Sequence, residues 1–225
     1  MLGATVVTVA ALGAWVLLWS GLLAVRHITV DGVSRLTARE VRAVADVHRD
    51  EPMITVDTRA VERRIARLGP VASVQVLRSW PSTLRIEVTE RQPVAVLVPP
   101  GGGPDRLVDR TGTAFATVTP RPLLLTPVRT AAPVPGEGAA AVRAAVRVLA
   151  TLPDGVRRDV VAVNAPSPAG ITLQLAGGVQ VVWGDDSHGA RKAAVLAALL
   201  AAPVPPGGHR PTVYDVSTPG VAVTR

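Results

Sequence analysis

The feature that most constrains this chain is a stretch without a charged side chain, from Leu2 to Val25. As an α-helix it reaches about 36 Å, enough to cross a hydrocarbon core of about 30 Å. A cleaved signal peptide is the alternative, but such peptides carry a basic segment before a shorter apolar core. No Lys or Arg precedes this stretch. The sequence therefore predicts an uncleaved transmembrane helix over residues 1–25.

The charges that flank this helix do not settle its orientation. Arg26 and His27 follow the apolar stretch and only the α-amino group precedes it, so the positive-inside rule alone favours a cytoplasmic C-terminal part. Long domains, however, cross the membrane largely regardless of flanking charge. The residues alone leave both orientations open.

Composition narrows the classes of function. The chain contains no Cys, which excludes disulfides and thiolate metal sites. Its net charge of +7 suits an anionic membrane surface, an acidic partner protein or nucleic acid. The basic residues are scattered and do not form one run, which favours a solvated basic surface over a nucleic-acid interface.

Residues 26–91 predict a compact α+β domain with the order strand, helix, helix, strand, strand. The first strand ends at Asp31-Gly32. Thr37 and Glu40 have the spacing of a capping box at the start of the first helix. Asp57 is positioned to cap the second helix, and Gly69-Pro70 is expected to end it.

The second helix carries a cluster of arginines that has two interpretations. The cluster is either a phosphate-binding face or the solvent side of an amphipathic helix, and the second is the commoner case. Its members are Arg59, Arg63, Arg64 and Arg67.

The two strands that follow the helices alternate apolar and polar residues. Leu84, Ile86 and Val88 are expected to face the core. Trp80-Pro81 is expected to form the corner between the strands, because proline cannot continue a ladder, and Trp80 is expected to pack nearby.

Residues 92–225 predict a mixed, β-rich domain with two helices. The segment "PVAVLV" is a strand, and "RLVDRTGTAF" is a hairpin around Arg110–Gly112. A proline-rich stretch over residues 117–138 holds a short apolar run, Leu123–Leu125. One helix precedes Pro153, three strands follow it, and a second helix that Ser187 is expected to cap leads to the last strands, in "TVYDVSTPGVAV".

No pattern in the chain predicts a catalytic, cofactor-binding or metal site. The four His are isolated, and no Walker, dinucleotide or zinc motif occurs. Asp185, Asp186, Ser187 and His188 are adjacent in sequence, whereas a hydrolytic triad is assembled in space. A helix cap with acidic residues beside the helix start explains this cluster better.

Several segments together resemble the FtsQ/DivIB family of bitopic bacterial cell-division proteins: "SWPSTLRIEVTERQPVA", "LVDRTGTAF", "GITLQLAGGVQVVWGDDSHGARKAAVLAALL" and "VYDVSTPGVAV". The resemblance implies a transmembrane helix over 1–25, a POTRA domain over 26–91 and a β-domain over 92–225. It also implies a junction between the two domains, marked by Trp80, Pro81, Glu90 and Pro93.

The resemblance further implies a non-enzymatic scaffold that links division proteins at the septum, with its C-terminal domains outside the cytoplasm and one pass through the cell membrane. The implied partners are FtsB-like and FtsL-like bitopic proteins, with no nucleic acid, cofactor or small-molecule substrate. A partner strand is expected to add to the C-terminal edge. The matching positions are Arg191, Lys192, Val213, Tyr214, Val216, Ser217, Gly220, Val221, Ala222 and Val223.

An acidic partner segment is expected to pair with Arg191 or Lys192. The alternative interpretation of these positions is a surface helix followed by a frayed strand. Two features depart from the family pattern: the apolar stretch starts at Leu2, where the family has a cytoplasmic tail, and the last strand is short and non-aromatic. The first is also expected if the sequence begins after such a tail.

Two rival functions remain on the sequence alone. One is another membrane-anchored protein, either an extracytoplasmic POTRA-type assembly or chaperone module or a tethered enzyme, which the lack of any predicted site disfavours. The other is a basic nucleic-acid-binding protein. A topology reporter fused after Arg225 separates the second from the scaffold, because an external C-terminus has no contact with DNA.

Overall fold

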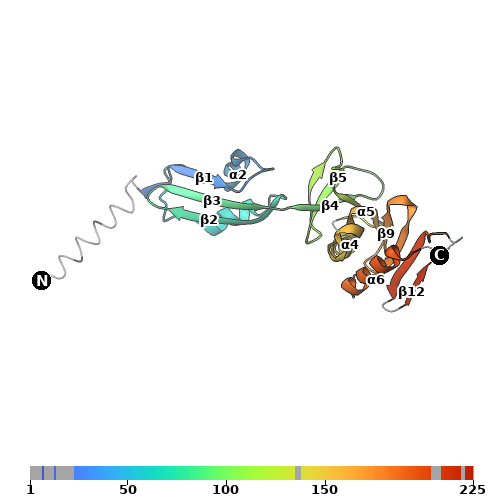
Figure 1. Ribbon diagram of the computed structural model, residues 1–225. Helices are drawn as coiled ribbons and strands as arrows, with labels where there is room; N and C mark the ends of the chain where they lie inside the picture. Colours follow the sequence, from blue (N-terminus) through green and yellow to red (C-terminus); the bar gives the residue numbers. More distant parts are fainter. Residues whose placement is uncertain are drawn as a thin grey trace. The chain divides into compact units, whose positions relative to one another are not determined.

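The computed structural model describes Val7, Gly13 and residues 23–134, 138–203, 209–218 and 221–224. The chain divides into two compact units, Met1–Arg91 and Gln92–Arg225 (Figure 1). The expected transmembrane helix lies almost entirely outside the described residues. Among the residues that are described, no helix combines the length and the apolar character needed to cross a bilayer.

The N-terminal unit has the order strand, helix, helix, strand, strand, as the sequence predicts. The elements are β1 (His27–Asp31), α2 (Ala38–Ala45), α3 (Thr58–Ile65), β2 (Val71–Ser79) and β3 (Thr83–Glu90). In the sheet, β3 lies between a parallel β1 and an antiparallel β2. The expected α+β arrangement of this unit is confirmed.

Each helix of this unit begins at a residue whose side chain accepts a hydrogen bond from a free backbone N–H group of the first turn. Glu40 N donates to Thr37 Oγ1 at 3.2 Å, and Thr37 N donates to Glu40 Oε2 at 2.7 Å, so the predicted capping box is confirmed. Asp57 Oδ1 accepts from Ala60 N at 3.0 Å and caps α3, also as predicted.

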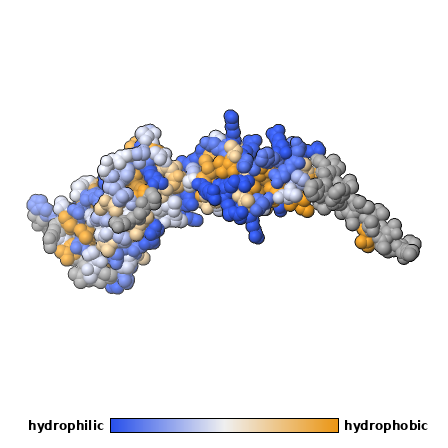
Figure 2. All heavy atoms as spheres, turned by 180° about the vertical axis from the view of Figure 1, so that it is seen from behind, coloured by the Kyte–Doolittle hydropathy of each residue, from blue (hydrophilic) through white to orange (hydrophobic). Residues whose placement is uncertain are grey.

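The two helices pack on one face of the sheet around a single apolar core. Leu84, Ile86 and Val88 are buried, while Arg85 and Thr89 are exposed, so the predicted alternation of β3 is confirmed. Each fully buried aliphatic side chain contributes about 1.5–3 kcal/mol by leaving water. On the face of this unit that Figure 2 shows, hydrophilic residues border a band of hydrophobic ones.

The start of the folded unit lies three residues before the expected boundary. Met53 N donates to Leu23 O, and Val25 N donates to Glu51 O, each at 2.9 Å. Val25 is fully buried in the core. Leu23–Val25, which the sequence assigns to the apolar helix, therefore belong to the N-terminal unit, because a loop pairs with their backbone.

The arginines of α3 do not all lie in solvent. Arg59, Arg63 and Arg67 are exposed, as expected for the wet side of the helix. Arg64 is instead half-buried, and its Nε donates to Ala45 O at 3.1 Å. Arg64 therefore satisfies a carbonyl at the end of α2 and joins the two helices.

The C-terminal unit is built on one sheet of nine strands in the order β12-β11-β10-β9-β8-β7-β4-β5-β6. The hairpin predicted around Arg110–Gly112 joins β5 to β6 and is confirmed. The strands are β4 (Pro93–Val98), β5 (Asp105–Asp109), β6 (Ala114–Val118), β7 (Thr126–Thr130), β8 (Val160–Ala165), β9 (Ile171–Leu175), β10 (Gln180–Gly184), β11 (Val213–Thr218) and β12 (Val221–Thr224).

The helices of this unit are α4 (Gly138–Thr151), α5 (Asp154–Asp159) and α6 (Gly189–Ala201), with a 3-10 turn, η2, at Ala176–Gly178. The sequence predicts only two of the three α-helices. The residues expected to end α4 instead begin the short α5, in which Arg157 N donates to Pro153 O at 2.8 Å.

The helices α4 and α6 contact each other and cover one face of the sheet. The main core lies beneath them and contains Trp183, Leu173 and Leu196, all fully buried. A smaller cluster formed around Val96 and Phe115 is separate from this core. The helices therefore fix the strands from β4 to β11 as one body.

Gly112 in the β5–β6 hairpin is required by a close approach to α4. Its φ is +80°, and a Cβ at this position would lie 2.7 Å from Cα of Arg143. Asp109 Oδ1 shapes the same turn, accepting from Thr111 N at 2.8 Å and Thr113 N at 3.0 Å. The "VDRTG" segment is thus a turn that allows the hairpin to lie against the helix.

Candidate partner-binding site

The strand β12 forms one edge of the nine-stranded sheet. It pairs antiparallel with β11, with Val223 opposite Asp215 and Thr224 opposite Tyr214. Val223 is 45% exposed. Of the predicted partner-binding residues here, Gly220 lies outside the described residues, as do the side chains of Val221 and Ala222. Among the described strands, the outer side of β12 has no neighbour, so its backbone is available for pairing.

The strand β11 is not available in the same way. It lies between a parallel β10 and an antiparallel β12, so both of its backbone edges are occupied. Tyr214 and Val216 are buried in the main core, which contradicts their predicted role in direct partner contact. Val213 and Ser217 are half-buried, and Ser217 N donates to Asp215 Oδ1 at 2.9 Å. The strand β11 supports the edge rather than forming it.

The two basic residues of α6 have opposite environments. Arg191 is exposed, whereas Lys192 is only 2% exposed. Lys192 Nζ donates to Trp183 O at 3.1 Å, to Asp185 O at 3.0 Å and to Asp185 Oδ1 at 2.9 Å. All three ammonium donors are therefore used inside the fold. The prediction that Lys192 pairs with an acidic partner segment is wrong, because the ammonium already joins α6 to the end of β10.

The carboxylate of Asp185 accepts hydrogen bonds from both Lys192 and Ser187. The Ser187 hydroxyl donates to Asp185 Oδ1 at 2.6 Å, and together with Lys192 it lowers the pKa of Asp185 from 3.8 to about 2. The prediction that Ser187 caps α6 is wrong. The residue at the cap is His188, with φ at 52°, and no side chain caps the helix, because the Ser187 hydroxyl is used by Asp185.

The adjacent Asp185, Ser187 and His188 also have a simple structural role. Ser187 Oγ lies 3.2 Å from His188 Nδ1, but its proton points to Asp185 rather than to the ring. All three residues lie on an exposed turn. Within the described part of the chain, no group of three His, Asp or Glu side chains has the geometry to hold a metal ion. The turn orders the start of α6.

Glu90, a predicted junction residue, is buried and is the last residue of β3. Its Oε1 accepts from Ser34 N at 2.8 Å and Leu36 N at 2.9 Å, and its Oε2 accepts from Arg35 N at 2.9 Å. Burial by itself raises the pKa of Glu90, but these backbone hydrogen bonds outweigh it, and the pKa lies below its ordinary value. The last residue of β3 therefore fixes the loop that leads into α2.

The other predicted junction residues have simpler positions. Trp80-Pro81 forms the corner between β2 and β3, as expected. Trp80 is 52% exposed, so the expectation that it packs against the fold is corrected. Pro93 begins β4 and lies opposite Asp109, at the first position of a strand, where proline is tolerated.

One feature of this region is not predicted from the sequence. The sequence predicts Asp185 only as part of an acidic helix start, but its carboxylate pairs with Lys192, and this pairing depends on how β10 meets α6. The spacing of seven residues between them gave a weak signal, because it fits a strand end and the second turn of the next helix.

Comparison with known proteins gives two family matches. The model for the POTRA domain of FtsQ type matches residues 23–91, and the model for the C-terminal part of cell division protein FtsQ/DivIB matches residues 96–216. The second match ends within β11, before β12.

Proteins named cell division protein FtsQ match nearly the whole chain. The one from Streptomyces bingchenggensis is 42% identical over 96% of this chain and 82% of its own length. The one from Streptomyces venezuelae is 40% identical over 92% of this chain and 76% of its own length. The one from Mycolicibacterium smegmatis is 39% identical over all of this chain but only 64% of its own length. The chain therefore belongs to the FtsQ/DivIB family of cell division proteins.

Proposed function

We propose that this protein is a non-enzymatic scaffold of the division septum, anchored by the residues before Leu23 and carrying a POTRA domain over 23–91 and a β-domain over 92–225 outside the cytoplasm. Its partners are FtsB-like and FtsL-like bitopic proteins in the cell membrane. Membership of the FtsQ/DivIB family and the uncharged stretch from Leu2 to Val25 support this proposal.

The observation that carries the partner-binding part of the proposal is the edge position of β12. An unpaired edge presents a row of N–H and C=O groups and is an aggregation hazard unless another strand covers it. A strand of the FtsB-like partner adds to β12, and the main-chain hydrogen bonds supply affinity. The exposed Val223 side chain lies on the same strand and adds apolar contact.

Arg191 provides an exposed charge on the helix that packs against the neighbour of this edge strand. It is exposed near the start of α6, and α6 packs on β11, the neighbour of β12. An acidic residue of the partner pairs with its guanidinium. Lys192 acts only indirectly, because its ammonium is bonded inside the fold and positions α6.

A proline scan over β12 tests strand addition. Along a strand, successive N–H groups point to opposite edges, so proline at 221 or 223 and proline at 222 or 224 remove donors on different sides. One pair faces β11 and the other faces the partner. We expect the partner-facing pair to abolish co-purification of the FtsB-like protein while the melting temperature of the full chain is unchanged.

The matched control is Val223→Ala beside Val223→Pro. The alanine variant keeps the backbone donor and should retain most partner binding, because the main chain supplies the affinity. Strand addition is excluded if every proline variant that stays folded still binds the partner. A reporter fused after Arg225 checks the proposed location, and activity of a cytoplasm-only reporter would contradict it.

A further inference from the structure

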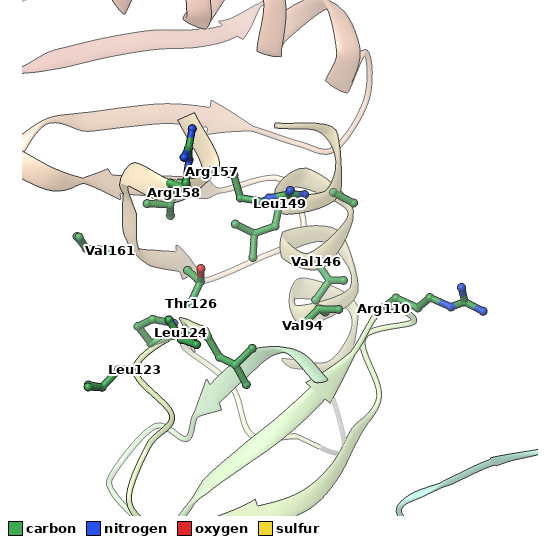
Figure 3. A pocket seen from close by; sticks show the side chains of 14 residues that line it. Val94, Arg110, Leu123, Leu124, Thr126, Val146, Leu149, Arg157, Arg158 and Val161 are labelled. Atoms are coloured by element: carbon green, nitrogen blue, oxygen red, sulfur yellow. The ribbon is translucent and has the colours of Figure 1, made fainter. Parts of the chain in front are cut away.

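A hollow of about 720 Å³ opens on the surface of the C-terminal unit, away from β12 (Figure 3). Its most exposed side chains are Leu123 and Leu124, which are 99% and 98% exposed. They belong to the short apolar run in the proline-rich segment between β6 and β7. Leucines this exposed contribute nothing to the free fold, and contiguous exposed apolar surface marks an interaction site.

Apolar residues from separate elements converge on the same hollow. Val146 and Leu149 reach it from α4, and the exposed Val94 and Val161 border it from β4 and β8. Figure 3 shows Leu123 and Val161 on one side of the hollow and the two α4 residues on the other. The site is therefore a groove between a rigid helix and a leucine-bearing loop.

The charged side chains that line the groove are all arginines: Arg110, Arg157 and Arg158. Arg157 forms an ion pair with Asp154, and Arg158 Nε donates to Asp154 O at 3.3 Å. Within the described residues, neither Arg110 nor Arg158 takes part in an ion pair. Figure 3 shows the guanidinium of Arg110 pointing away from the hollow, so the groove combines an apolar lining with one arginine, Arg158, whose charge lacks a partner carboxylate among the described residues.

Strand addition cannot occupy this groove. The strand β7 is paired with β4 and β8, and β8 is paired with β7 and β9. Neither strand therefore has a free edge with which another strand could pair. The groove also lies five strands from β12, roughly 24 Å at the usual strand spacing. An occupant must bind through side chains, and it does not compete with a strand on β12.

We propose that this groove binds an amphipathic helix of a partner protein, with acidic residues flanking its apolar stripe. Apolar side chains spaced at one and two helical turns fill the space beside Leu123, Leu124 and Leu149. A flanking carboxylate pairs with Arg158. A concave site between a helix and a loop suits a helix better than it suits a planar bilayer.

Two synthetic helical peptides with the same leucine stripe test this proposal, one with flanking Glu and one with flanking Lys. Their binding to the full chain in detergent is measured by fluorescence anisotropy. We expect the Glu peptide to bind and the Lys peptide not to bind. Leu123→Ser with Leu124→Ser should weaken the Glu peptide at least about tenfold, as for loss of an apolar anchor. The matched control is Leu77→Ser, an exposed leucine in the N-terminal unit.

Arg158→Glu should reverse the preference, so that the Lys peptide binds and the Glu peptide does not. This reversal cannot come from misfolding, because an unfolded variant loses both peptides. Equal binding of the two peptides, or binding of neither, overturns the proposal. So does leucine-dependent binding to phosphatidylglycerol vesicles without peptide binding, which assigns the groove to a lipid surface. Leucine-dependent self-association without peptide binding assigns it to a second copy of the chain and also overturns the proposal.

Discussion

The ammonium group of Lys192 lies 2.9 Å from Oδ1 of Asp185, and its two other hydrogen bonds go to backbone carbonyls at the end of β10. The lysine is buried, while the aspartate side chain is half-exposed. The pair therefore joins the start of α6 to the sheet from the inside and leaves Arg191 as the basic side chain that faces solvent.

Lys192→Met is expected to loosen this joint. Methionine keeps the length of the side chain but leaves the carbonyls of Trp183 and Asp185 without their donor, at a cost of about 1–3 kcal/mol. Hydrogen exchange of the full chain should show the loss in α6 and β10 peptides. Arg191→Met is the matched control and should leave exchange unchanged, since its side chain is in solvent. Equal exchange in the two variants would contradict the internal role of Lys192.

The pair also predicts a titration at acidic pH. The pKa of Asp185 is about 2 against an ordinary value of 3.8, so the folded form binds the proton more weakly than the unfolded form. The stabilisation is therefore complete above pH 3.8 and is lost as the pH falls toward about 2. A carbon-13 NMR titration of the carboxylate should have its midpoint near 2. Ser187→Ala should raise that midpoint, because the Ser187 hydroxyl is the largest cause of the shift; an unchanged midpoint would refute this assignment.

Local chemistry explains which parts of the fold could be predicted from sequence. The capping box of Thr37 and Glu40 and the cap at Asp57 depend on residues three positions apart, so the pattern contains the whole interaction. The alternation of buried and exposed residues in β3 can also be predicted, because it follows from the strand's own sequence. The burial of Lys192 cannot be predicted in this way, because it depends on where β10 meets α6, which no local spacing fixes.

Glu90→Gln is expected to destabilise the N-terminal unit. The amide keeps one acceptor oxygen but replaces the other with a donor, and it removes the charge that three backbone N–H groups now bind. We expect a loss of about 1–3 kcal/mol in the free energy of opening of α2, measured by hydrogen exchange. The matched control is Glu87→Gln on the same strand, a half-exposed position where about 0.5 kcal/mol or less is expected. Similar losses in both variants would show that the loop does not depend on Glu90.

Strand pairing explains the errors at the candidate site. Tyr214 and Val223 lie in neighbouring strand segments that look alike in sequence, yet only β12 is an edge, because β11 also pairs with β10 across a long connection. The exposed Leu123 and Leu124 were equally unforeseen. An apolar run in a sequence predicts burial, and only the packed fold shows that nothing among the described residues covers it.

Gly112→Ala should separate α4 from the β5–β6 hairpin, and Gly177→Ala provides its matched control. The two glycines have nearly the same backbone conformation, with φ at +80° and +76°. A Cβ at Gly177 meets no atom within 4 Å, so that variant bears only the cost of a left-handed alanine, about 1–2 kcal/mol. A Cβ at Gly112 meets the backbone of Arg143 as well, which must move. We expect a larger loss of stability for Gly112→Ala in thermal unfolding of the full chain, together with faster hydrogen exchange in α4. Equal losses of stability in the two variants would mean that α4 can move away from the hairpin without a loss of free energy, which would contradict the prediction.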